Sequence, residues 1–196
     1  MAKQTITADD VMALDDYLAV RRERRSAMAE VKRKRRLAVG PDMTFYFESR
    51  ETILHQIHEM LAIEKGGPEQ LADELDAYGP LVPQGRDLVA TVMVEIPDEA
   101  RRRATLATLG GFEETLTLTF AGHTVRAEAE QDVDRTTAEG KASSVQFVHF
   151  PMSDEQARQF RQPGCEVVVA VNHPAYRHMM IMPEEMRRVL AEDLAA

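Results

Sequence analysis

The spacing of apolar residues near the start of the chain predicts a first helix. Val11, Leu14 and Leu18 recur at the interval that places side chains on one helical face. Thr7 and Asp10 precede them with the spacing of a capping box, in which two side chains satisfy free backbone N–H groups. The helix is therefore expected to begin at Thr7.

A change of period then predicts a β-hairpin over residues 36–48. Leu37 and Val39 alternate with other residues before a Gly-Pro-Asp turn, and Phe45 and Phe47 alternate after it. Alternate residues of a strand lie on one face, so these four side chains are expected to point the same way.

Ser49 caps a second predicted helix over residues 50–65, which Gly66 and Gly67 end. A short helix opened by Pro68 follows. The apolar residues of the longer helix fall on one side of it, and they are Ile53, Leu54, Ile57, Met60 and Leu61.

The second half of the chain is rich in predicted strands. Short helices are expected after Pro97, after Ser153 and after Pro183. The predicted fold class is α+β, with N-terminal helices and a β-hairpin, followed by an antiparallel-rich sheet with helices on one face. The predicted strands cover residues 88–96, 115–120, 123–130, 144–150 and 165–171.

The segment AYGPLVPQG, residues 77–85, is the best candidate boundary because it contains two prolines and two glycines. It separates a helical region with the hairpin, residues 1–80, from an α+β sheet domain, residues 86–196. We expect the two regions to pack as one globular unit.

Composition places the chain among folded globular proteins. Of its 196 residues, 44% are hydrophobic and 29% are charged, which are ordinary values. No apolar run approaches the roughly 20 residues of a membrane helix, and the N-terminus MAKQTITADD lacks the apolar core of a signal peptide. A single cysteine, Cys165, excludes an internal disulfide. A cytoplasmic protein without membrane association is expected.

Charge is distributed unevenly along the chain. The net charge is −9, yet residues 21–36 contain nine Lys or Arg residues and two Glu residues. Such a segment binds an anionic partner or packs across the protein's own acidic surface. Arg33, Lys34 and Arg35 are the candidate partner-binding residues. Nucleic acid remains an alternative partner, disfavoured because the segment has no aromatic residue to stack on bases and the whole chain is acidic.

Four polar residues of the predicted helix 50–65 are candidate metal ligands. Glu51, His55 and Glu59 follow one another at four-residue intervals, and His58 lies beside His55. All four are expected opposite the apolar side of the helix. One helix rarely supplies more than two ligands to an ion, so a divalent metal would need further ligands, for which His173 and His178 are the candidates. The competing interpretation is a ridge that faces water, without a cofactor.

The stretch NHPAYRHMMIM, residues 172–182, is expected to form a turn after the last strand. Met179, Met180 and Met182, together with Met186, form a soft apolar patch within or near it. Methionine side chains adapt to irregular surfaces, so the patch is either core or a surface that contacts another chain.

Recognised catalytic signatures are missing from the sequence. It contains no HExxH, GxSxG, GxxxxGK[ST] or GxGxxG motif. Cys165 is expected to be a small buried hydrophobic residue, because no neighbouring base is evident. Whether the protein is an enzyme is therefore left open.

Several segments together carry a resemblance to a known family. The hairpin RRLAVGPDMTFYFES, the helix sequence QIHEML, the boundary AYGPLVP and the turn HPAY occur in one order along the chain. In that order they resemble an uncharacterised bacterial family of about this length, classed as a domain of unknown function. The resemblance implies genes beside rubrerythrin-like proteins and iron–sulfur proteins of the heterodisulfide-reductase type, and hence a role in redox or peroxide metabolism.

These observations favour a non-catalytic accessory protein that docks to redox partners of that kind. The unequal charge, the methionine patch and the missing catalytic motifs all point this way. Two alternatives are retained, namely a metal-binding protein or metal-dependent enzyme and a nucleic-acid-binding protein. Self-association into a homo-oligomer is a further expectation.

Overall fold

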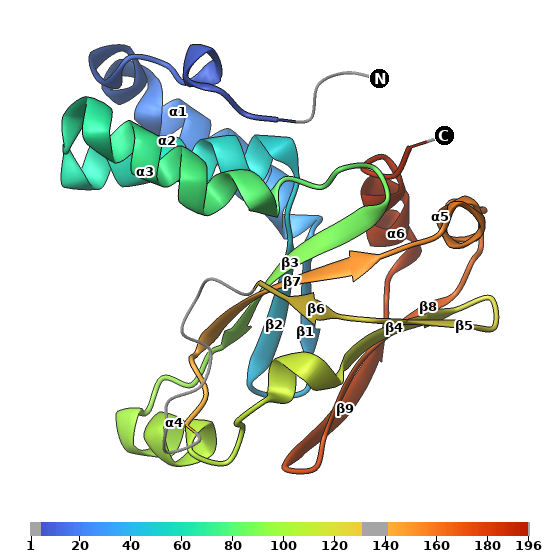
Figure 1. Ribbon diagram of the computed structural model, residues 1–196. Coiled ribbons are helices and arrows are strands. Elements are labelled where there is room, and N and C mark those ends of the chain that lie inside the picture. Colours follow the sequence, from blue (N-terminus) through green and yellow to red (C-terminus); the bar gives the residue numbers. More distant parts are fainter. Residues whose placement is uncertain (1–4, 131–140, 196) are drawn as a thin grey trace.

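The computed structural model describes residues 5–130 and 141–195, which form a helical layer and two antiparallel sheets (Figure 1). The helical layer consists of α1 (Leu14–Arg33), α2 (Arg50–Glu64) and α3 (Gly67–Tyr78). The α+β class predicted from the sequence is confirmed. Among the described residues, no helix combines the length and the apolar character that crossing a membrane requires.

The first sheet, sheet A, has the strand order β1-β2-β3-β7-β6, and every neighbouring pair is antiparallel. The predicted hairpin forms its first two strands and continues directly into the sheet through pairing of β2 with β3. The strands are β1 (Arg36–Val39), β2 (Met43–Phe47), β3 (Asp87–Val94), β7 (Val145–Pro151) and β6 (Glu128–Ala129).

The second sheet, sheet B, has the order β5-β4-β8-β9 and is also antiparallel. The strands are β5 (His123–Arg126), β4 (Leu116–Phe120), β8 (Val167–His173) and β9 (Tyr176–Ile181). The helices are α4 (Glu99–Leu106), α5 (Asp154–Phe160) and α6 (Glu184–Ala191), and the turns are η1 (Ala8–Asp10), η2 (Gly79–Leu81) and η3 (Phe112–Thr115). Among the described residues, α4 and η3 lie between β3 and β4, α5 lies between β7 and β8, α6 follows β9, and η1 and η2 flank the helical layer.

Alternation along the strands gives sheet A two different faces. One face contributes Phe45, Ala90 and Val148 to the main core, which it shares with sheet B residues such as Leu118 and Val169. The other face lies under the helical layer, where a smaller core joins β3 to the helices. Because side chains of a strand alternate between faces, the same three strands build both the main core and the floor beneath the helices.

The α2 helix begins as the sequence predicts. Ser49 Oγ accepts a hydrogen bond from the Thr52 N–H at 3.3 Å, and Thr52 Oγ1 accepts one from the Ser49 N–H at 2.8 Å. This reciprocal cap satisfies two N–H groups that the first turn leaves without helical partners. It also fixes the direction in which the chain leaves β2.

Two expectations about elements are wrong. The Thr7–Asp10 capping pair forms, but it closes the short turn η1, and the long helix begins only at Leu14. Residues 172–182 are not just a turn, because they include the strand β9. Five consecutive residues of β9 are exposed, so the strand lacks the apolar alternation by which strands are found in sequences.

Candidate functional site

Two of the four α2 residues predicted to face water, His58 and Glu59, lie against α1 in an α1–α2 polar cluster with Tyr17 and Arg21. Glu59 accepts a hydrogen bond from the Tyr17 hydroxyl at 2.7 Å and two from Arg21 at 3.0 and 2.9 Å. The hydrogen bonds from Arg21 hold the pKa of Glu59 at about 2, well below its ordinary value. Burial, followed by the neighbouring Glu59, raises the pKa of Tyr17.

His58 has a structural role within this cluster. Its side chain is only 3% exposed, and its ring stacks on Tyr17 with ring centroids 4.7 Å apart. Its Nε2 atom accepts a hydrogen bond from the Met12 N–H at 2.9 Å, and burial lowers the pKa of the ring. The ring is therefore neutral near pH 7, and the nitrogen that faces Met12 has no free lone pair for a metal.

The expectation of a water-facing ridge is thus wrong for His58 and Glu59, because α1 covers them. Glu51 is exposed and His55 is intermediate, and both line a small hollow of about 110 Å³ between α1 and α2. Burial, followed by the positive charge of Lys32, lowers the pKa of His55. Residues 5–130 and 141–195 contain no group of three or more His, Cys, Asp and Glu side chains placed to hold a metal ion.

His173 and His178 lie in the β8–β9 hairpin, at the opposite end of the molecule from the helical layer (Figure 1). His173 Nδ1 accepts a hydrogen bond from the Ala175 N–H at 3.3 Å, while the His178 ring packs against Tyr176 with ring centroids 4.4 Å apart. The structure therefore does not bring either histidine to the α2 residues with which they were expected to share an ion.

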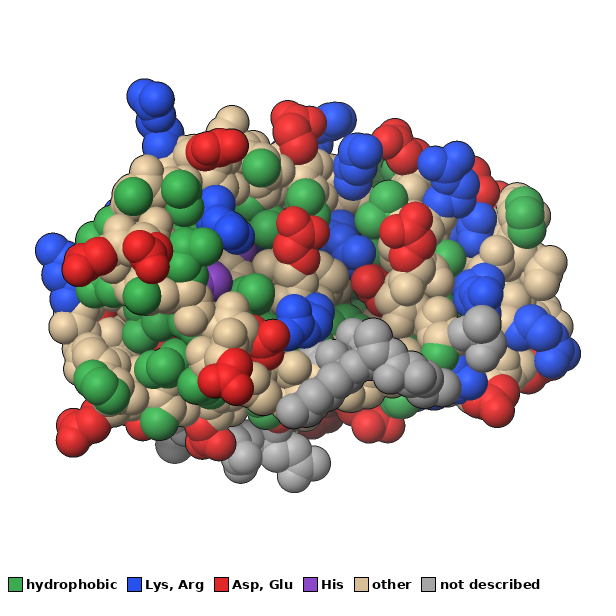
Figure 2. All heavy atoms as spheres, turned by 90° about the horizontal axis from the view of Figure 1, so that it is seen from above, with side chains coloured by type: hydrophobic (Ala, Val, Ile, Leu, Met, Phe, Trp, Pro, Cys, Tyr) green, Lys and Arg blue, Asp and Glu red, His purple; other side chains and the backbone are tan. Residues whose placement is uncertain are grey.

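The basic segment pairs largely with acidic residues of the same chain. Arg33 contacts Glu30 at 2.9 Å, and Lys34 approaches Glu185 at 4.0 Å. Seen from the helical side, basic and acidic side chains are interspersed across the surface (Figure 2). Of the three candidate partner-binding residues, Arg33 and Lys34 are exposed and Arg35 is buried.

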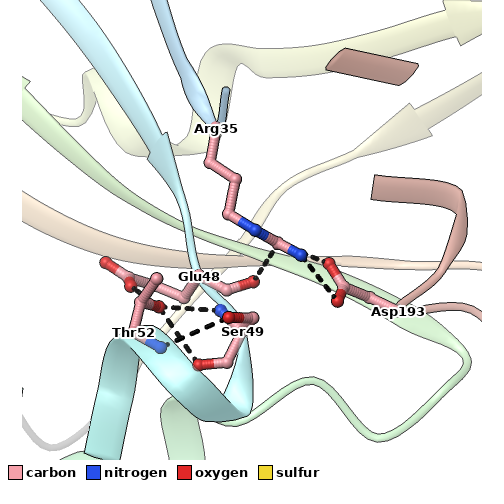
Figure 3. A network of polar contacts seen from close by, with 5 residues as sticks. All are labelled: Arg35, Glu48, Ser49, Thr52 and Asp193. Atoms are coloured by element: carbon pink, nitrogen blue, oxygen red, sulfur yellow. Dashed lines mark hydrogen bonds and ion pairs between the residues drawn. The ribbon is translucent and has the colours of Figure 1, made fainter. Parts of the chain in front are cut away.

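Arg35, which lies between α1 and β1, anchors a polar network that reaches Asp193 after α6 (Figure 3). Its guanidinium donates to both carboxylate oxygens of Asp193, at 2.6 and 3.0 Å, and to the backbone oxygen of Glu48 at 3.2 Å. The Glu48 carboxylate points away from Arg35 and accepts hydrogen bonds from Thr52 at 2.5 Å and Thr91 at 2.7 Å. The network thus ties β1, β2, β3, α2 and the segment after α6 together.

Above this network lies a cavity of about 390 Å³ between the helical layer and sheet A, which we call the helical-face cavity. Its floor is the face of β2, β3 and β7 that points away from the main core, and α2, α3 and the end of α1 form its walls. The lining residues are Lys32, Arg35, Tyr46, Phe47, Glu48, Thr52, Ile53, Gln56, Tyr78, Leu81, Thr91, Met93, Val145 and Phe147. Sequence patterns did not reveal this cavity, because its residues come from segments far apart in the chain.

The predicted methionine patch is divided between core and surface. Met182 and Met186 are buried, at 4% and 5% exposure, whereas Met179 and Met180 are 71% and 42% exposed. Both exposed residues lie on β9, which is one of the two edge strands of sheet B. Ile181 adds a third exposed apolar side chain, at 56%.

A further polar site lies on β7. His149 Nδ1 is 3.0 Å from Asp87, and its Nε2 is 3.0 Å from Glu130. The hydrogen bond with Asp87, followed by the charges of the two carboxylates, raises the pKa of His149, although burial opposes the shift. No local sequence pattern indicates the two acidic partners of this histidine.

The fold and these contacts define a class of α+β protein in which a helical layer covers one of two antiparallel sheets. The chain belongs to the DUF3501 family, described as a protein of unknown function, whose sequence profile matches residues 5–194. The predicted resemblance to a family of unknown function is confirmed. No curated protein matches the chain.

A crystal structure from Burkholderia pseudomallei K96243 is similar to this chain. It is described as a novel protein of unknown function. The two are 34% identical, with a TM-score of 0.90, and the match covers 97% of this chain and 100% of that chain. The arrangement of helical layer and sheets is therefore shared with a solved member of the same fold.

Proposed function

We propose that this protein is a non-catalytic accessory protein that docks an extended segment of a partner protein along β9. The observation that supports this proposal is that some backbone groups of β9 point away from its neighbour β8. Met182 donates its N–H to Val167 of β8 at 2.8 Å. Backbone groups of an antiparallel strand alternate in direction, so Arg177, Met179 and Ile181 direct theirs away from β8.

The side chains of this edge indicate which side chains a partner segment should carry. Residues 173–182 contain one arginine and two histidines but no carboxylate, and Met179, Met180 and Ile181 expose apolar side chains. A strand that adds to a sheet edge gains main-chain hydrogen bonds, and its side chains supply specificity. The partner segment is therefore apolar with acidic residues that can pair with Arg177.

The class of partner follows from the family resemblance. The resemblance drawn from the sequence implies neighbouring genes for rubrerythrin-like and iron–sulfur proteins, and on that basis we propose a partner of this kind in redox or peroxide metabolism. The alternative occupant of the edge is β9 of a second copy, which would produce a homodimer. Light scattering at the concentrations used for binding distinguishes the two.

Met179→Pro tests the docking edge. Proline removes the outward N–H at this position without removing a hydrogen bond to β8, and it is tolerated on edge strands of this kind. Met179→Thr is the matched control, because it also loses the apolar side chain but keeps the N–H. Each variant is titrated by biolayer interferometry against the purified rubrerythrin-like protein of the same host.

We expect the proline variant to bind that protein about tenfold more weakly than the threonine variant, because a main-chain hydrogen bond at the edge is lost and the strand is interrupted. Equal binding by the wild type and both variants would contradict docking through β9. A wild-type dimer that becomes monomeric only in the proline variant would assign the edge to a second copy instead. Absence of binding by the wild type would refute this class of partner.

A further inference from the structure

The lining of the helical-face cavity includes one lysine without an ion-pair partner among the described residues. Lys32 is partly buried at the end of α1, and its ammonium forms no ion pair with any residue in the described ranges. The Glu48 carboxylate, by contrast, already accepts one hydroxyl on each oxygen, from Thr52 and Thr91. The nearby Arg35 is neutralised by Asp193. The Lys32 ammonium is therefore the charged group in the cavity that can form an ion pair with an anionic ligand.

The rest of the lining favours a ligand with an aromatic body. Four rings line the cavity, from Tyr46, Phe47, Tyr78 and Phe147, together with four aliphatic or methionine side chains and the threonine methyl groups. Aromatic rings gain offset-stacked or edge-to-face contacts beyond simple burial of area. At about 30 Å³ per water-sized unit, a volume of 390 Å³ corresponds to a molecule of about a dozen non-hydrogen atoms.

Glu48, which also lines the cavity, adds a second polar requirement. Each of its carboxylate oxygens has acceptor capacity beyond the single threonine hydroxyl that it receives. Glu48 would repel a second negative charge, but it can accept a hydrogen bond from a hydroxyl or amine. A ligand that fits the cavity therefore carries both an acidic group and a separate hydrogen-bond donor.

We propose that the helical-face cavity binds a small aromatic carboxylate that also carries a hydrogen-bond donor. Its carboxylate pairs with Lys32, its ring packs between Tyr78 and Phe147, and its donor contacts Glu48. This site is on the opposite side of sheet A from sheet B, to which β9 belongs, so it is independent of the proposed docking edge. Binding at the cavity and docking at β9 can be tested separately.

Three related probes test the two polar requirements. The complete probe is 3-(4-hydroxyphenyl)propanoate, 3-phenylpropanoate lacks the donor, and 3-(4-hydroxyphenyl)propanamide lacks the negative charge. Binding to the full chain is measured by saturation-transfer NMR and by isothermal titration calorimetry. We expect the complete probe to bind about tenfold more tightly than the amide, because a charge-assisted hydrogen bond is lost, and more tightly than the probe without a hydroxyl.

Two variants locate the site. Lys32→Met should weaken binding of the complete probe by about tenfold, whereas Lys34→Met, which changes an exposed lysine two residues away outside the lining, should leave it unchanged. Val145→Phe fills the cavity from β7 and should abolish binding, with circular dichroism and thermal unfolding confirming that it folds.

Three results would overturn the proposal. They are equal affinity for the acid and the amide, equal losses in the Lys32 and Lys34 variants, and absence of saturation transfer at millimolar concentrations of the complete probe. If Val145→Phe does not fold, the comparison of Lys32→Met with Lys34→Met decides alone. Selective loss of binding in Lys32→Met, together with preference for the acid over the amide, would establish the site.

Discussion

Replacing Glu59 by glutamine tests how strongly the polar cluster holds α1 on α2. The carboxylate is only 15% exposed and is bound by Tyr17 and Arg21. Its pKa falls from the ordinary 4.5 to about 2, chiefly because of the hydrogen bonds from Arg21. Glutamine keeps the shape and a hydrogen bond to Tyr17 but removes the charge that pairs with arginine.

The pKa difference sets an upper limit on the effect. A fall from 4.5 to about 2 corresponds to about 3 kcal/mol of folding free energy, at about 1.4 kcal/mol for each pH unit. Because Arg21 is 30% exposed, solvent screening reduces the expected loss in Glu59→Gln to about 1–2 kcal/mol at neutral pH. This contribution is fully present above pH 4.5 and is lost as the pH falls from there towards 2.

Urea unfolding from neutral pH down to about pH 3 measures this effect. The free energies of unfolding of the wild type and Glu59→Gln should differ most near neutral pH and converge below pH 4.5, since the unfolded wild type takes up the proton there. Glu51→Gln is the control, because it makes the same change at an exposed position of α2. Equal stability of Glu59→Gln and the wild type at neutral pH, or parallel curves throughout, would refute the reasoning.

Two further predictions concern the sheets. His149→Ala should lower the free energy of unfolding at acidic pH, where His149 is charged in the wild type. The difference from the wild type should shrink as the pH rises from about 6.5 through the raised pKa of His149 in the folded protein, because the charge is lost there. A pH-independent difference in urea unfolding would contradict this. Gly40→Ala should destabilise by at least about 1–3 kcal/mol, because Gly40 has φ +75° and a Cβ would lie 2.5 Å from the Tyr176 hydroxyl. A thermal midpoint equal to that of the wild type would show that the turn tolerates the side chain.

The sequence predicts those elements whose residues alternate or cap locally. The hairpin follows from Leu37, Val39, Phe45 and Phe47, all of which are buried in the main core. The helix after Ser49 follows from a cap formed within four residues. In both cases the physical cause lies within a few positions along the chain, so a single sequence contains it.

The remaining features depend on contacts between distant segments. His149 lies 62 residues from Asp87 and 19 from Glu130, and no local pattern links them. Glu59 appeared to face water because its helix has an apolar side elsewhere, yet a second helix covers it with arginine and tyrosine. The helical layer packs here through polar side chains, which hydrophobic periodicity does not detect.

The pairing of Arg35 with Asp193 has a consequence for the order of folding. The two residues are 158 positions apart, and contacts between such distant segments form late because closing a long loop costs entropy. A partly folded chain in which the segment after α6 has not docked would leave the charge of Arg35, which lines the cavity, without its counterion. Occupancy of the cavity would then report completion of the native state, since a ligand that binds only that state stabilises it by mass action.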